Sequence, residues 1–390
     1  MPASVDALFA FLLAGILALA LVPLTDRLAR RIGAIDYPDD QRSLHAAPTP
    51  RLGGLAIFAA VLAAALIWLP WDAETRSILI GAALIVAVGM LDDVYELNAA
   101  AKLLGQTAAV VVPVSAGVTV DSLTVPFLGQ LNPGNVELLS LPGGGAVDLG
   151  DVGTTIGIVA MINVINLIDG VDGLAAGVCL ISGVALAVIA LSLDRTAAGV
   201  LAALTAGASL GFLRHGFPPA STFMGDTGSN LLGFLLGVVA VQGALKTNAV
   251  IALFLPLIVL TVPILDTGFV VAKRLKYGRP IYRADRWHFH HRMANIGFSQ
   301  RRTLAYLYGW TAIMAALALA LRFVPYSDDH GSFDALWTAV MALFGLLALA
   351  ASVYLVYVLE ILKLRRFGRI DPETGEFEAL DPETGEFEAI

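Results

Sequence analysis

The sequence predicts an all-α polytopic membrane protein with about eleven transmembrane helices. We expect its N-terminus outside, its C-terminus in the cytosol and a short extracytoplasmic β-hairpin near 118–150. Hydrophobic residues make up 57% of the 390 residues and charged residues only 14%. A soluble fold could not bury that much apolar surface, so the bilayer must act as solvent for most of it.

Runs of roughly 20 apolar residues are long enough to cross a bilayer. We interpret the first run as a retained span, because it lacks a basic start and a small-residue cleavage site before the next arginines. In chain order the predicted spans are 6–24, 53–70, 77–91, 99–117, 152–168, 173–193, 197–213, 229–244, 248–272, 303–323 and 334–362.

The Lys and Arg residues are distributed very unevenly over the connections. With the N-terminus outside, one side receives 20 of the 24, and the other receives only Arg76, Arg195, Lys246 and Arg322. Cytoplasmic loops carry the excess of basic residues, so the first side faces the cytosol. The 118–150 connection then lies outside, and its β-branched pieces, separated by Gly and Pro, predict the hairpin.

Residues 1–370 form the predicted membrane domain, and 371–390 are two near-identical acidic decapeptides. These decapeptides account for the net charge of −8, so the membrane domain is formally neutral and no nucleic-acid partner is expected. Pro and Gly in the tail discourage a helix; we expect disorder, and a partner-binding extension is the alternative. The single cysteine, Cys179, excludes a disulfide framework, a thiolate zinc site and an iron–sulfur cluster.

Ionisable residues in this chain gather at the predicted cytosolic ends of spans, and such residues at membrane depth indicate function. The fifth span ends with Asn163, Asn166, Asp169 and Asp172, which recur every three residues and would form one stripe on a helix. A stripe of amides and carboxylates beside glycines suits a metal and a phosphorylated ligand. The alternative is an interhelical hydrogen-bond seam.

Three further acids lie at other span ends. Asp92 and Asp93 end the third span; on a regular helix they would point about 100° apart, and the alternative is a solvated helix terminus. Asp226 lies in FMGDTGSN between glycines, where the backbone can expose N–H groups to an anion. It could instead cap the next helix, with Thr227 or Ser229 as rival caps.

Carboxylates and amides are hard ligands, which favours Mg²⁺, or Mn²⁺, over zinc. The loop after the ninth span holds His288, His290, His291 and Arg292 among many basic residues. Without a thiolate, a zinc site there is disfavoured, and these side chains would donate hydrogen bonds to phosphate and hydroxyl oxygens. The alternative for the basic residues is a topology determinant that also touches anionic lipid.

These motifs, with DYPDDQRSLHAAPTPRLGG at 36–54, resemble the polyprenyl-phosphate N-acetylhexosamine 1-phosphate transferases of glycosyltransferase family 4. The resemblance runs from about residue 30 to 300. The pattern HFHHR is similar to the WecA/TagO-like branch, which uses UDP-GlcNAc. The MraY branch, which uses UDP-MurNAc-pentapeptide, carries three consecutive histidines, whereas Phe289 interrupts them here.

The resemblance implies transfer of GlcNAc 1-phosphate from UDP-GlcNAc to a polyprenyl phosphate, with release of UMP at the cytosolic face of a bacterial-type plasma membrane. It implies that Asp226 binds Mg²⁺ with Asn166 as a second contact, and that Lys102 meets the pyrophosphate. Asp169 and Asp172 would position the nucleotide or sugar. Relatives also make a homodimer an expectation.

For the remaining motif residues, the resemblance implies that His290, His291 and Arg292 hold the UDP-GlcNAc phosphates and sugar, and that Asp92 and Asp93 serve the acceptor phosphate. Further substrate-binding candidates in the same motifs are Asn163, His288 and Arg51.

A phosphate monoester has a second pKa near 6, so the lipid phosphate is already mostly dianionic at neutral pH. We therefore expect direct in-line attack on the β-phosphorus, with a covalent aspartyl-phosphate route as the alternative.

A secondary transporter is the alternative from another class, but the spans show no internal repeat and the acids lie at one end rather than at the midplane. A CDP-alcohol phosphotransferase would need an arginine that the DGVDG motif lacks. The sequence leaves open the lipid's chain length and the polymer that is built, such as lipopolysaccharide O-antigen or teichoic acid.

Overall fold

The computed structural model describes residues 2–37, 48–125, 129–140, 146–245, 250–276, 289–325, 334–366, 368–370, 377–380 and 387–389. The chain divides into two compact units, Met1–Gly268 with Tyr306–Val324, and Phe269–Ala305 with Pro325–Ile390. All the candidate aspartates belong to the first unit, which is described first.

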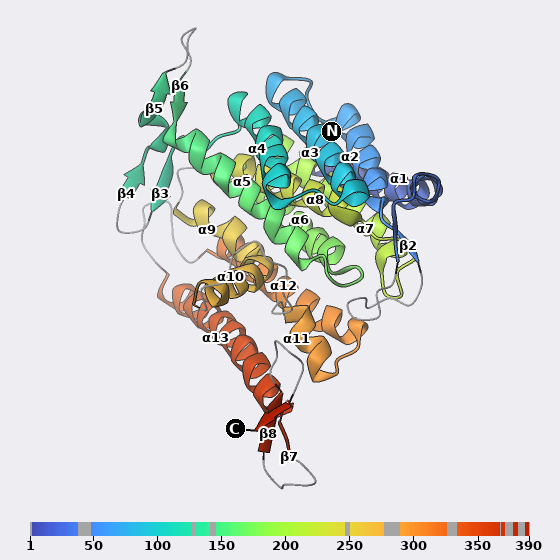
Figure 1. Ribbon diagram of the computed structural model, residues 1–390. Helices are drawn as coiled ribbons and strands as arrows, with labels where there is room; N and C mark the ends of the chain where they lie inside the picture. The colour runs from blue at the N-terminus through green and yellow to red at the C-terminus, as the bar shows by residue number, and fades with distance from the viewer. Residues whose placement is uncertain are drawn as a thin grey trace. The chain divides into compact units, whose positions relative to one another are not determined.

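Helices form most of the first unit (Figure 1). They are α1 (Ala3–Ile32), α2 (Gly53–Trp68), α3 (Ala73–Tyr95), α4 (Ala99–Ser115), α5 (Leu149–Ile168), α6 (Leu174–Ser192), α7 (Thr196–Gly216), α8 (Gly225–Ala240), the π-helical turn η2 (Val241–Leu245) and α9 (Val250–Val259). Helices α10 (Thr261–Lys276) and α12 (Gln300–Phe323) have residues in both units, while α11 (Phe289–Ile296) and α13 (Ala335–Arg366) belong to the second.

Helix α1 shows how the sequence separates a protein face from a lipid face. Small residues at helical spacing, such as Ala10, Ala14 and Ala18, are fully buried, and α1 packs along α7. Leu12 and Ile16 point away and are 45% and 62% exposed. Small residues let helix backbones approach closely inside a bilayer, and the exposed branched side chains suit contact with lipid chains.

Helix α8 is the centre of the unit. It packs against α2, α3, α5 and α7, and every residue from Thr227 to Ala240 is buried. Two glycines allow this approach: a Cβ on Gly54 of α2 would lie 2.2 Å from the Gly228 nitrogen, and one on Gly89 of α3 would lie 2.6 Å from the Asp226 carbonyl oxygen. The first turn of α8, which carries Asp226, is therefore fixed by backbone contact with two neighbouring helices.

Seven helices among the described residues are long and apolar enough to cross a membrane, by length and composition: α1, α3, α5, α6, α7, α12 and residues Ala335–Tyr354 of α13. Shorter apolar helices are Gly53–Trp68, Ala99–Ser115 and Thr261–Ala272. The protein is thus a multi-pass, mostly helical membrane protein. The count of eleven and the orientation remain predictions.

The predicted span over 248–272 is divided at Leu260 into two helices, α9 and α10, while the Leu260 N–H still donates to the Pro256 carbonyl and the Ile264 N–H to the Leu260 carbonyl. That these residues cross the membrane as one span remains a prediction. Pro263 has no N–H to donate to the Val259 carbonyl four residues earlier, which interrupts the helix. The hydroxyl of Ser182 on α6 donates to that carbonyl instead, at 3.5 Å.

The 118–150 connection contains two antiparallel strand pairs where the sequence predicts one hairpin. Strand β3 (Leu123–Val125) pairs with β4 (Gly129–Leu131), and β5 (Glu137–Ser140) pairs with β6 (Ala146–Asp148), with the 3₁₀ turn η1 (Pro133–Asn135) between them. A further pair, β1 (Ile35–Asp36) with β2 (Thr49–Pro50), precedes α2. The extracytoplasmic position of the first two pairs remains a prediction.

In the second unit, the guanidinium of Arg292 on α11 lies 4.0 Å from the centre of the Phe269 ring. In the tail, where the sequence predicts disorder, the described residues form an antiparallel sheet of β7 (Gly368–Ile370), β8 (Phe377–Leu380) and β9 (Phe387–Ala389). Phe377 and Phe387 each begin a stretch that alternates apolar and acidic residues, the two-residue period of a strand.

Candidate active site

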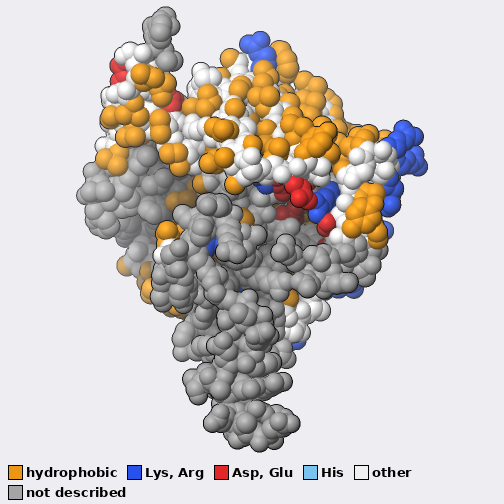
Figure 2. Space-filling model, viewed as in Figure 1, with side chains coloured by type: hydrophobic (Ala, Val, Ile, Leu, Met, Phe, Trp, Pro, Cys, Tyr) orange, Lys and Arg blue, Asp and Glu red, His pale blue; other side chains and the backbone are white. Residues whose placement is uncertain are grey.

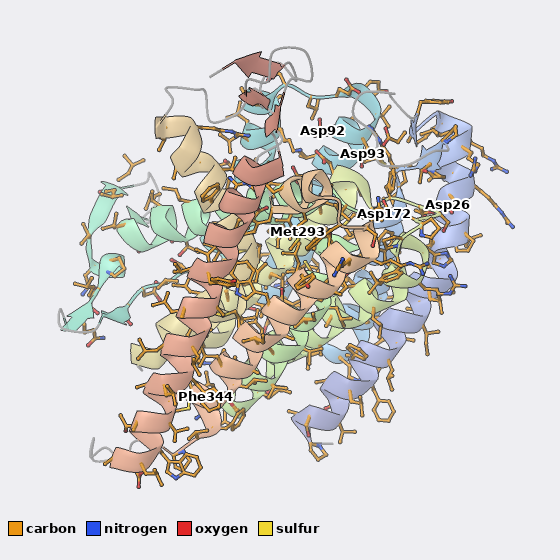
Figure 3. The ribbon with its side chains drawn as sticks, turned by 90° about the horizontal axis from the view of Figure 1, so that it is seen from below. Asp26, Asp92, Asp93, Asp172, Met293 and Phe344 are labelled. Carbon is orange, nitrogen blue, oxygen red and sulfur yellow. The ribbon has the colours of Figure 1, made fainter. Side chains whose placement is uncertain are left out.

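Asp92 and Asp93 lie at the end of α3 (Figure 3), and they have different partners. Asp92 Oδ1 accepts a hydrogen bond from the Leu97 N–H at 2.7 Å, and its Oδ2 pairs with Lys102 Nζ at 2.9 Å. Leu97 follows the left-handed Glu96 that ends the helix, so Asp92 also closes the turn between α3 and α4. One oxygen of Asp92 is therefore held by the backbone, while the other faces Lys102 in the site.

Asp93 holds the N-terminus of α8. Its Oδ1 accepts from the Asp226 N–H at 2.8 Å, and its Oδ2 accepts from the Thr227 N–H at 3.0 Å and from the Thr227 hydroxyl at 2.6 Å. Helix N-termini leave such N–H groups without intrahelical partners and favour negative charge. Asp93 thus serves as a cap supplied by another helix.

Asp226 is not a cap for its own helix. Helix α8 has no side-chain cap hydrogen bond, and its N-cap residue is Met224. The Asp226 carboxylate instead points to α4 and α5: Oδ1 accepts from Asn166 Nδ2 at 2.7 Å, and Oδ2 forms an ion pair with Lys102. The carboxylate stays available for chemistry because Asp93 satisfies the helix end.

Lys102, in the first turn of α4, joins these groups. Its ammonium contacts the carboxylates of Asp92 and Asp226 and donates to Asn166 Oδ1 at 3.3 Å. Asn166 Nδ2 also donates to Ser229 Oγ at 2.9 Å. Side chains from the ends of α3 and α5 and from the start of α8 therefore meet around one cationic side chain in the first turn of α4.

Asn163 lies one turn deeper on α5 and belongs to a chain of amides. Its Nδ2 donates to Gln106 Oε1 at 2.8 Å, and Gln106 Nε2 lies 3.4 Å from Asn230 Oδ1. Gln106 and Asn230 are fully buried. Neither amide was predicted from the sequence; for Gln106, the available signal was an amide four residues after Lys102 inside an apolar run.

The predicted stripe on α5 ends before its last members, because the helix ends at Ile168. Asp169 is the C-cap residue, and Asp172 lies in the turn before α6, where its Oδ2 accepts from the Ala220 N–H at 3.0 Å. Burial raises the pKa of Asp169 well above its ordinary value, and nearby carboxylates, Asp226 first, raise it further. These two acids lie on a loop beside the site rather than on a helix face.

Arg51 lies beside the start of α8 but pairs with another residue. Its guanidinium forms an ion pair with Asp36, which joins the two ends of the β1–β2 segment. Its carbonyl oxygen is close to Gly225: a Cβ there would lie 2.2 Å from it, and Gly225 has a positive φ of 65°. Glycine is therefore required at this junction.

The predicted histidine cluster belongs to the second unit. His288 lies outside the described residues, and His290 and His291 fall in α11 with side chains that are also outside them. The Arg292 side chain is buried against Phe269 within that unit. The role of these four residues in substrate binding remains a prediction.

Among the described residues, no three His, Cys, Asp or Glu side chains surround a point that could hold a metal ion. Oxygen atoms of Asp92, Asp226 and Asn166 nevertheless converge on the Lys102 ammonium. The point where these oxygens meet is therefore already occupied by a positive charge, that of the lysine side chain. Mg²⁺ usually takes one or two carboxylates and completes its shell with water and substrate phosphates. Two carboxylates and one amide fit that requirement.

The arrangement suits the handling of phosphate at a membrane boundary. Acidic and basic side chains of the first unit gather at one border of a broad apolar surface (Figure 2). A ligand with a polar phosphate and a long apolar chain could contact both regions at once. A cation between carboxylates can neutralise phosphate charge.

Comparison with known proteins agrees with this chemistry. Residues 75–244 match the model of a family described as glycosyl transferase family 4. The chain is 37% identical over 313 residues to a probable undecaprenyl-phosphate N-acetylglucosaminyl 1-phosphate transferase of Bacillus subtilis (strain 168), covering 80% of this chain and 84% of that protein.

Two other relatives represent different substrates. A decaprenyl-phosphate N-acetylglucosaminephosphotransferase of Mycolicibacterium smegmatis is 36% identical over 74% of this chain and 75% of its own length. A phospho-N-acetylmuramoyl-pentapeptide-transferase of Desulforudis audaxviator is 34% identical over 82% of this chain and 98% of its own length.

Proposed function

Because the chain belongs to glycosyl transferase family 4, we propose that it transfers N-acetylglucosamine 1-phosphate from UDP-GlcNAc to a polyprenyl phosphate of the undecaprenyl or decaprenyl type, releasing UMP. The observation that carries this proposal is the convergence of Asp92, Lys102, Asn166 and Asp226 on one point where the helices α3, α4, α5 and α8 begin or end. The products are polyprenyl-diphospho-GlcNAc and UMP.

Asp226 and Asn166 would hold a Mg²⁺ ion, and Mn²⁺ has the same ligand preference. The ion would supply charge neutralisation on the transferring phosphorus and on the leaving UMP. Lys102 would move from the carboxylates to the pyrophosphate of the donor, since its three donors can exchange carboxylate for phosphate oxygens. Lys102 Nζ now lies 2.9 Å from Asp92 Oδ2, the length of an ordinary charge-assisted hydrogen bond. A hydrogen bond from Lys102 to a phosphate oxygen of the donor would be equivalent to it.

The acceptor reacts by direct in-line attack of its phosphate oxygen on the β-phosphorus of the donor. A phosphate monoester with a second pKa near 6 needs little deprotonation at neutral pH, so Asp92 orients the acceptor or takes its residual proton. Asp93, whose carboxylate accepts three hydrogen bonds from α8, positions Asp226. Asp169 and Asp172 orient the nucleotide or sugar from the loop between α5 and α6.

The reaction takes place at the cytosolic face of a plasma membrane, because UDP-GlcNAc is soluble and the uneven distribution of Lys and Arg puts this end of the helices in the cytosol. The product would be the first lipid-linked intermediate of a cell-envelope polysaccharide such as teichoic acid or the lipopolysaccharide O-antigen. A homodimer is part of the proposal by analogy with relatives.

Transfer of phospho-MurNAc-pentapeptide is the second candidate, since the Desulforudis relative matches along nearly its whole length. The interrupted histidine run, His288–Phe289–His290–His291, favours the GlcNAc branch.

A donor screen tests the proposal. Purified protein receives a polyprenyl phosphate and, in turn, UDP-GlcNAc, UDP-GalNAc or UDP-MurNAc-pentapeptide, each with Mg²⁺ or with a chelator, and UMP release and the lipid product are measured. We expect turnover with UDP-GlcNAc and loss of turnover in the chelator. Turnover with the pentapeptide donor alone would replace the proposal with the second candidate.

A further inference from the structure

Tyr308 on α12 contacts the start of α6, outside every motif discussed above. Its hydroxyl donates a hydrogen bond to the Gly173 carbonyl oxygen at 2.5 Å. One turn further along α6, Gly177 leaves room for the ring: a Cβ there would lie 2.1 Å from the Tyr308 Cζ and 2.2 Å from its Oη. The phenol therefore reaches Gly173 only because residue 177 has no side chain.

Gly173 ends the loop that carries Asp169 and Asp172. It adopts a positive φ of 75° as the N-cap of α6, and no side chain caps this helix. Other hydrogen bonds of the loop run from the Asp169 N–H to the Asn166 carbonyl at 3.2 Å and from the Ala220 N–H to Asp172 at 3.0 Å, and Gly173 also packs against the end of α7. Tyr308 adds a contact that joins the far end of this loop to α12.

Asp169 and Asp172 stand four residues and one residue before Gly173. A hydrogen bond that holds the Gly173 carbonyl oxygen on α12 therefore restricts how far these two acids can move from the site. The contact adds no charge to a site that already contains several carboxylates.

We propose that Tyr308 is a positioning residue that holds the Asp169–Gly173 loop in place for the nucleotide sugar, and that Gly177 leaves the space that its ring occupies. The inference rests on the proposed function for the role of the loop in donor binding. The contact itself does not depend on that function.

Two substitutions break the contact by different routes. Tyr308→Phe removes the hydroxyl and keeps the ring. Gly177→Ala keeps the hydroxyl but pushes the ring away, although alanine is the better helix former. A net intramolecular hydrogen bond corresponds to a change of between about twofold and about tenfold in a local equilibrium.

The test measures hydrogen exchange of the amides in 169–174 together with steady-state kinetics. In both variants we expect these amides to exchange between about twofold and about tenfold faster, and the donor KM to rise by a similar factor. The kcat and the acceptor KM should change by less than about twofold. The double variant should exchange no faster than the faster single variant, because both remove one contact.

The chain supplies matched controls on the same helix. Thr311→Val removes a buried hydroxyl that donates within α12, to the Leu307 carbonyl at 2.8 Å. Gly309→Ala adds a methyl group next to Tyr308, where nothing lies within 4 Å. Both should behave as the wild type. Cys179, a buried thiol two residues beyond Gly177, should stay slow to react in every variant, which excludes general unfolding.

Wild-type exchange and donor KM in Tyr308→Phe would overturn the inference. So would additive effects in the double variant, or an equal effect of Thr311→Val. If the wild-type protein transfers nothing from UDP-GlcNAc, the proposed function fails, while the exchange data still decide whether Tyr308 holds the loop.

Discussion

Replacing Lys102 by methionine tests the centre of the site directly. Methionine has a similar length but carries no charge, and the Lys102 side chain is only 18% exposed. In Lys102→Met, the carboxylates of Asp92 and Asp226 lose the cation that lies between them. The variant should therefore be less stable without a metal and more dependent on one.

The size of the effect follows from the burial of the pair. Two unit charges about 4 Å apart interact with about 4 kcal/mol at an effective dielectric constant near 20. Removing one partner of a buried pair typically costs about 3–5 kcal/mol, because the other charge is left uncompensated. The Asp92 side chain is 12% exposed and the Asp226 side chain 27%, so we expect the lower end, about 3 kcal/mol. A divalent ion at 100 times its Kd would restore about 2.7 kcal/mol.

The assay is thermal unfolding of the detergent-solubilised protein in a chelator and then in Mg²⁺ or Mn²⁺. Lys102→Met should unfold well below the wild type in the chelator and recover most of the difference with metal. Lys102→Arg keeps the charge, and Arg76→Met removes an exposed cation at the other end of α3; both should show the wild-type response to metal. Equal stability of Lys102→Met and wild type in the chelator would refute the reasoning, as would an equal response to metal.

Four further substitutions probe other parts of the site. Asp226→Ala should abolish UMP release while the protein still elutes as a folded species, because it removes the carboxylate that faces the cation; normal rates would contradict the metal assignment. Asp93→Asn should lower the free energy of unfolding by about 2–4 kcal/mol, since an amide cannot accept three hydrogen bonds with full charge, and an unchanged unfolding temperature would exclude this capping role. Asp169→Asn should be more stable than the wild type at pH 7. Because the carboxyl pKa is raised, the contribution of Asp169 to wild-type stability is fully present below about pH 4 and is lost as pH rises through the folded-state pKa, so parallel stability-versus-pH curves of the two proteins would count against it. His290→Ala should raise the KM for UDP-GlcNAc or lower kcat sharply, measured as UMP release, whereas a rise in the acceptor KM alone would assign the histidine to the lipid.

The sequence could predict the convergence of the acids because rare ionisable residues stand out in apolar runs. It could also predict that Asp92 and Asp93 diverge, since adjacent helix positions point about 100° apart. Their roles depend on partners from α4 and α8, which no local pattern specifies. Whether Asp226 caps its helix was likewise undecidable, because the cap comes from Asp93, more than a hundred residues earlier.

Other features escaped sequence reasoning for identifiable reasons. The apolar run over 248–272 does not show that the helix is interrupted at Leu260. Pro263 could have predicted the interruption, but the continuous hydropathy of the run was given more weight. Gln106 was not predicted, because the candidates were chosen mainly as ionisable residues at span ends and a single amide in an apolar run is uncharged. Tyr308 lies beyond the motifs altogether, and only the packing of α12 against α6 reveals its contact.

The glycines at 54 and 89 also limit how the protein can vary. Even a methyl group at either position would overlap the main chain of the opening turn of α8, which has no freedom to withdraw. The turn that carries Asp226 should remain nearly invariant in any selection for altered specificity or for resistance to inhibitors.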